Sequence, residues 1–93
     1  MNKLTKFPEI EKEILKKLKE KNIEVPNIEV TRQDLKTFEN PQIIKYLYVL
    51  IVYEKGGMCG YTIIDQVSLE ASNIHSDEYI INKLADFIIK RWT

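Results

Sequence analysis

The chain has 93 residues, and its 14 lysine and arginine residues balance its 14 aspartate and glutamate residues, so the formal net charge is zero. A chain of this length forms one small domain, and we expect a single domain over residues 1–93. Zero net charge excludes an overall field that would draw the molecule to phosphate backbones or acidic membranes.

A first helix is expected from about Pro8 to Lys21. Its apolar residues recur every three or four positions, which places them on one stripe: Phe7, Ile10, Ile14, Leu15 and Leu18. Pro8 suits the first turn, where its missing N–H costs nothing. Acidic residues toward the start and lysines toward the end complement the helix dipole. Because the two charges are interleaved, the lysines indicate a solvated outer face.

Alternation beginning at Ile28 predicts a first strand from about Ile28 to Phe38. The pattern falters between Arg32 and Lys36, which indicates a bulge or an early end of the strand. The segment Glu39-Asn40-Pro41 then forms a turn.

The longest apolar run, Ile43 to Tyr53, predicts a central strand, since it is β-branched and aromatic and too short to cross a membrane as a helix. Alternate side chains of a strand point to opposite faces, and here both faces are apolar. Compact aliphatic residues suit a core between helices and a sheet, so we expect one set to lie under the helices: Leu47, Val49 and Ile51. The opposite face then holds Tyr46, Tyr48, Leu50 and Val52.

The segment Glu54 to Gly60 is expected to be a hairpin loop, and its three glycines allow backbone conformations that other residues avoid. A strand follows it, which argues against a phosphate-binding loop, because such loops precede a helix. In that third strand the odd-numbered residues from Tyr61 to Ala71 form a mostly apolar face. Asp65 is the exception, and we expect it to lie at the sheet rim or to pair with a lysine or arginine.

Ser76 is expected to cap a second helix, with Asp77 and Glu78 in its first turn. One apolar stripe of this helix contains Ile80, Leu84, Phe87 and Ile88. A second set widens the apolar arc: Ile81, Ala85, Ile89 and Trp92. This arc exceeds what one sheet can cover, so the excess should meet the first helix or another chain.

The predicted fold class is therefore α+β. We expect a two-layer sandwich in the order helix-strand-strand-strand-helix, with a three-stranded antiparallel meander and both helices on one face of the sheet. The other face is left open. Interfaces favour tyrosine, so the residues predicted to bind a partner are Tyr46, Tyr48, Leu50, Val52, Ile64 and Trp92.

Residues with catalytic or metal-binding chemistry are few. Cys59 and His75 are the only pair that could form a thiol nucleophile with its base, but their spacing does not bring them together. One cysteine and one histidine cannot supply the four ligands of a structural zinc site. We expect no enzyme activity, no metal, no cofactor and no small-molecule substrate.

The order of helix, three strands and helix resembles that of double-stranded RNA-binding domains. Those domains carry a lysine cluster at the start of the second helix for phosphate contacts. The matching residues here are Ser76, Asp77 and Glu78, and the two acids would repel phosphate. Duplex RNA binding is the alternative function that this resemblance implies.

The leading hypothesis is a non-enzymatic interaction protein that self-associates or binds another protein through the open apolar face of its sheet. The N-terminal residues lack the apolar stretch of a signal peptide, and the single cysteine fits a reducing compartment, so a soluble cytoplasmic protein is expected. Many small viral and mobile-element accessory proteins share this neutral, motif-free character, which is an analogy of size and composition.

Overall fold

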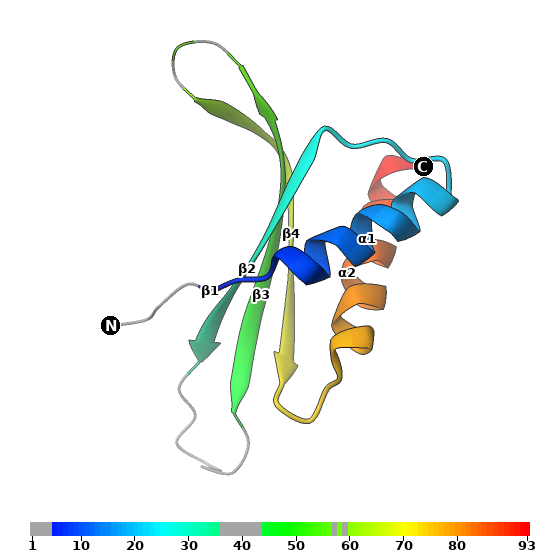
Figure 1. Cartoon of the computed structure of the whole chain (residues 1–93). Helices are drawn as coiled ribbons and strands as arrows, with labels where there is room; N and C mark the ends of the chain where they lie inside the picture. Colours follow the sequence, from blue (N-terminus) through cyan, green and yellow to red (C-terminus); the bar gives the residue numbers. More distant parts are fainter. Residues whose placement is uncertain (1–4, 36–43, 57, 59) are drawn as a thin grey trace.

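A computed structural model describes residues 5–35, 44–56, 58 and 60–93. Its elements, in chain order, are β1 (Thr5–Lys6), α1 (Pro8–Glu20), β2 (Asn27–Leu35), β3 (Lys45–Lys55), β4 (Tyr61–Ser72) and α2 (Asp77–Trp92). The strands form one antiparallel sheet in the order β1-β2-β3-β4, and both helices lie on the same side of it (Figure 1). The predicted α+β fold is confirmed, and the two-residue strand β1 adds a short edge to the meander.

The helices begin and end where their local chemistry predicts. Helix α1 begins at Pro8 and ends at Glu20. Asn22 follows shortly after, and its φ of 60° lies in the left-handed region that asparagine tolerates. At the start of α2, the Ser76 side chain accepts a hydrogen bond from the Tyr79 N–H at 3.2 Å. None of the helices in the described ranges is long and apolar enough to cross a membrane.

The first long strand is more regular than the sequence predicted. β2 pairs residue by residue with β3 from Asn27 to Leu35, so the bulge expected after Arg32 does not occur within the described part of this strand. The expected continuation to Phe38 and the turn at residues 39–41 lie outside the described residues.

A bulge occurs instead in β4. Val52 pairs with Asp65, but the next residue of β3, Tyr53, pairs with Ile63, which leaves Ile64 as an extra residue. Alternation therefore shifts at Ile64, so that Tyr61 and Ile63 share a face with Tyr53. The prediction of one unbroken alternation from Tyr61 to Ala71 is wrong at this point.

The core lies between the sheet and the two helices. Leu50 and Val52 are fully buried there, and Tyr48 is 5% exposed. Tyr46 packs partly buried against the same core. The prediction that these four residues occupy the open face is wrong, and so is the placement of a second set of residues under the helices: Leu47, Val49 and Ile51.

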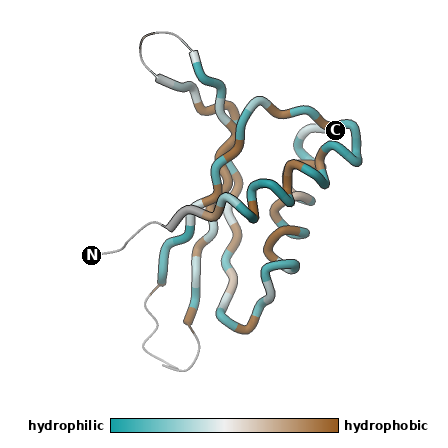
Figure 2. Tube along the Cα trace, in the orientation of Figure 1, coloured by the Kyte–Doolittle hydropathy of each residue, from teal (hydrophilic) through white to brown (hydrophobic). Residues whose placement is uncertain are grey.

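Neighbouring strands explain this reversal. Leu50 and Val52 lie opposite Val30 and Ile28 of β2, and all four are buried. The alternate residues of β3 have polar neighbours instead, since Val49 pairs with Thr31 and Ser68, and Ile51 with Glu29 and Gln66. Only one face of the sheet is apolar on all three long strands, β2, β3 and β4, and the helices pack against that face. Figure 2 shows hydrophobic residues along the strands and along both helices.

Of the two alternatives for the wide apolar arc of α2, the first helix or another chain, the structure shows contact with the first helix. Ala85 is buried, Ile81 and Ile89 pack partly buried against the core, and α1 contacts α2. The arc is therefore part of the packing within the chain.

Candidate protein-interaction surface

The bare face of the sheet carries a band of apolar side chains, which we call the open-face stripe. Its members share the face opposite the helices: Leu47, Val49, Ile51 and Tyr53 of β3, and Ile63 and Tyr61 of β4. The four residues of β3 are half-buried, whereas Tyr61 is 62% exposed and Ile63 is 51% exposed. The most accessible part of the stripe thus lies toward the β3–β4 hairpin.

Polar residues border the stripe within the sheet. On one side Leu47, Val49 and Ile51 pair with Gln33, Thr31 and Glu29 of β2. On the other side the same three pair with Glu70, Ser68 and Gln66 of β4. An apolar centre with a polar rim is the usual arrangement of a protein-binding surface.

The β3–β4 hairpin extends past the rest of the sheet. The first residue of β2, Asn27, pairs with Tyr53, so Lys55 pairs only with Tyr61 of the same hairpin. The ring centroids of Tyr53 and Tyr61 lie 5.1 Å apart, a contact that supports an otherwise isolated two-stranded ribbon. Gly60, with a φ of 94°, supplies the backbone conformation that closes the turn. The ribbon projects away from the helices in Figure 1.

The six residues predicted to bind a partner do not form one surface. Tyr48, Leu50 and Val52 belong to the core, and Tyr46 packs against it. Ile64 is 44% exposed at the bulge, and Trp92 is half-buried on α2. The residues that sequence reasoning missed are Leu47, Val49, Ile51, Tyr53, Tyr61 and Ile63. The polar alternation of β2 was the signal that could have indicated the first three.

Asp65 has the basic partner that its place on an apolar face required. Its carboxylate accepts from Arg91 Nε at 2.8 Å and Nη2 at 2.7 Å, and from the indole N–H of Trp92 at 3.1 Å. Hydrogen bonding from Arg91 is the main cause that lowers the pKa of Asp65, and Asp65 in turn raises the pKa of Arg91. The cluster fastens the last turn of α2 to β4, so the indole N–H of Trp92 is already used within the chain.

His75 also has a structural role. Its Nδ1 accepts from the Ser72 N–H at 3.0 Å, and its ring stacks on Tyr79 with centroids 4.3 Å apart. Cys59, its suggested catalytic partner, lies outside the described residues. Within the described ranges, no group of three or more histidine, cysteine, aspartate or glutamate residues is placed to hold a metal ion.

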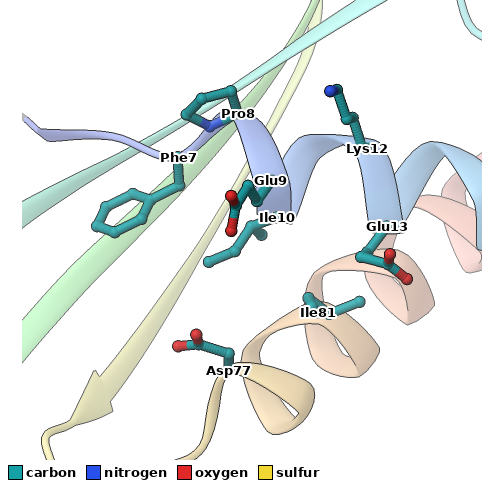
Figure 3. A pocket seen from close by; sticks show the side chains of 8 residues that line it. All are labelled: Phe7, Pro8, Glu9, Ile10, Lys12, Glu13, Asp77 and Ile81. Carbon is teal, nitrogen blue, oxygen red and sulfur yellow. The ribbon is translucent and has the colours of Figure 1, made fainter.

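A groove of about 560 Å³ lies between the first turns of the two helices (Figure 3). Phe7, Ile10 and Ile81 give it an apolar lining, and its charged residues are Glu9, Lys12, Glu13 and Asp77. Acidic residues are stabilised at helix N-termini by the helix dipole, which accounts for their presence here.

No family model, curated protein or solved structure matches the chain. The class that the fold defines is a small two-layer α+β domain. Its helices cover one face of the sheet, and an apolar stripe lies on the other.

Proposed function

We propose that this chain is a non-catalytic protein-interaction module and that the open-face stripe is the surface that contacts its protein partner. The observation that carries the proposal is the continuous line of apolar side chains from Leu47 to Tyr61 on the sheet face away from the helices. A contiguous apolar patch on a small domain is typical of an interaction site. We further propose that the module acts in the cytoplasm, because its single cysteine needs no oxidising compartment.

The size of the bare face is compatible with a specific but modest interface. Strands of 9 to 12 residues, rising about 3.3 Å per residue and spaced about 4.8 Å apart, make a face on the order of 500 Å² over β2, β3 and β4. An equal area on a partner brings the total to about 1,000 Å², the lower end for specific interfaces. The exposed tyrosine and isoleucine near the hairpin would supply the largest apolar contribution.

Photo-crosslinking in the cells that produce the protein tests the proposal. A photo-reactive amino acid is placed at Val49 in the stripe, and a matched control carries it at Asn82, an exposed residue of α2 on the opposite side of the molecule. We expect covalent protein adducts from position 49 and far fewer from position 82. Mass spectrometry of the adduct then identifies the partner as another protein or a second copy.

The control also defines the result that contradicts the proposal. If irradiation yields no more protein adduct at position 49 than at position 82, the stripe is not a contact surface. Circular dichroism of both labelled proteins verifies that each retains the fold.

A further inference from the structure

The outer edge of β4 is the second surface to consider, because no other described strand pairs with it. In an antiparallel ladder, backbone groups point alternately toward the neighbouring strand and away from it. The Asn73 N–H bonds the Ile44 carbonyl at 2.9 Å, which sets the phase of this alternation. Between the bulge at Ile64 and the end of β4, the outward-pointing backbone groups therefore belong to Gln66, Ser68, Glu70 and Ser72.

Both ends of the segment from Gln66 to Ser72 are closed by side chains of the same chain. At one end, the Gln66 N–H donates to the Asp65 carboxylate at 2.8 Å. At the other end, the Ser72 N–H donates to Nδ1 of His75, and the Ser72 carbonyl accepts from the His75 N–H, each at 3.0 Å. A new strand cannot use these two donors without displacing their present acceptors.

The opposite edge of the sheet is closed in a similar way. Strand β1 pairs with β2, the Phe7 N–H bonds the Val30 carbonyl, and the Val30 N–H donates to Glu11 of α1 at 2.8 Å. Between its two closed ends, the stretch from Gln66 to Ser72 has an open middle segment, where the amides of Ser68 and Glu70 face outward.

We propose that a second copy of this chain pairs with the open segment of β4, antiparallel and with a two-fold axis at Leu69. In this register Ser68 lies opposite Glu70 of the second copy, and Glu70 opposite its Ser68. The two open amides of each copy then meet the outward carbonyls of the other, forming four hydrogen bonds. The closed amides, Gln66 and Ser72, lie three residues on either side of Leu69 and face each other at the ends.

Side chains fit the same register. Leu69, which is half-buried, lies opposite Leu69 of the second copy as a non-hydrogen-bonded pair, the kind that brings side chains closest. Val67 lies opposite Ala71 on that face. The two acidic residues of β4 face neutral ones, since Asp65 lies opposite Asn73 and Glu70 opposite Ser68. The strand also lacks the lysine and proline that commonly protect sheet edges.

This pairing is independent of the open-face stripe, because it uses backbone groups at the edge and leaves the stripe bare. It would join the two sheets into one and bring the two stripes onto a single broader face. Failure of the stripe as a contact surface would not affect the edge pairing, and the two are tested with different variants.

Backbone amide exchange measured by NMR at several protein concentrations tests the edge pairing directly. We expect exchange at Ser68 and Glu70 to slow at least several-fold as concentration rises, while exchange at Gln66 and Ser72 stays constant because those amides are already bonded. If Ser68 and Glu70 exchange at the same rate at all concentrations, the proposal is overturned. This measurement uses the unmodified chain and needs no variant to fold.

Light scattering of variants is the second test of the edge pairing. Ser68→Pro removes an outward N–H without breaking a bond to β3, so we expect it to abolish the concentration-dependent dimer. Ser68→Ala keeps that N–H and Val49→Glu alters only the stripe, and both should still form the dimer. A dimer that persists in Ser68→Pro, or that is lost in Val49→Glu alone, would overturn the edge pairing.

Discussion

Asp65 shows how a charged side chain is accommodated on the apolar side of a strand. Its side chain is 12% exposed, and three N–H groups from consecutive residues at the end of α2 bond its two oxygens. Arg91 is more than half exposed, so solvent screens the ion pair and its net contribution to stability is modest. The main consequence of the ion pair is geometric. The pair holds the end of α2 against β4 and leaves Asp65 placed to bond the Gln66 amide.

The lowered pKa of Asp65 predicts a pH dependence of stability. A carboxyl group whose pKa is lower in the folded state stabilises that state when ionised. This stability is fully present above the ordinary pKa of 3.8 and is lost as pH falls through the lowered value. We therefore expect Asp65→Asn to unfold more easily than the original chain at pH 7 in urea.

The difference between these two chains should shrink as pH falls below about 4, close to the ordinary pKa of an aspartate. Urea unfolding at pH 7, 4 and 3 measures it. A constant difference across this range would show that the Asp65 charge does not contribute to stability.

The need for an Asp65 partner could be predicted from the sequence, but the identity of that partner could not. An aspartate among apolar alternate residues must find a donor, which is a local argument. Arg91 is 26 residues away, and only the packing of α2 on β4 brings the two together. The bonds that Asp65 and His75 make to the edge amides are local by contrast, since they join residues one and three positions apart.

At the scale of elements, helices were the most predictable because their signals are local. Ser76, the acidic first turn of α2 and the proline that opens α1 each act within one turn of chain. The faces of β3 were predicted wrongly because both are apolar, so the sequence of β3 alone does not indicate which face the helices cover. Which face of β3 is buried depends on the alternation of apolar and polar residues in β2 and β4 and on the register in which these strands pair with β3.

The bulge at Ile64 could not be predicted for a related reason. The residues on both sides of it continue the same alternating pattern, and only the pairing with β3 reveals the extra residue. This one residue turns Tyr61 and Ile63 toward the bare face and so determines where the most exposed part of the stripe lies.

The cap of α2 gives a prediction at this scale. Ser76→Ala removes the acceptor of the Tyr79 N–H, and we expect it to lower the free energy of unfolding by about 1 kcal/mol. Ser76→Asp keeps an acceptor at the same place and should retain most of the stability. Urea denaturation followed by circular dichroism measures both variants, and equal stability of Ser76→Ala and the original chain would contradict the role of the cap.

For the molecule as a whole, the unequal covering of the two sheet faces is the central feature. The helices bury Leu50 and Val52 completely, whereas the alternate residues of β3 have only the polar side chains of adjacent strands around them. A domain of 93 residues has a small core, so each buried side chain supports a large share of its stability. The bare face contributes less to folding and is available for contact.

The most direct test compares two neighbouring residues of β3 that point to opposite faces. Urea unfolding of Leu50→Ala should show a loss of about 2–5 kcal/mol, because a filled position in the core becomes a cavity. Ile51→Ala, on the bare face, should lose only about 1 kcal/mol. Equal losses, or a larger loss for Ile51→Ala, would mean that the stripe is covered within the chain and would contradict the account.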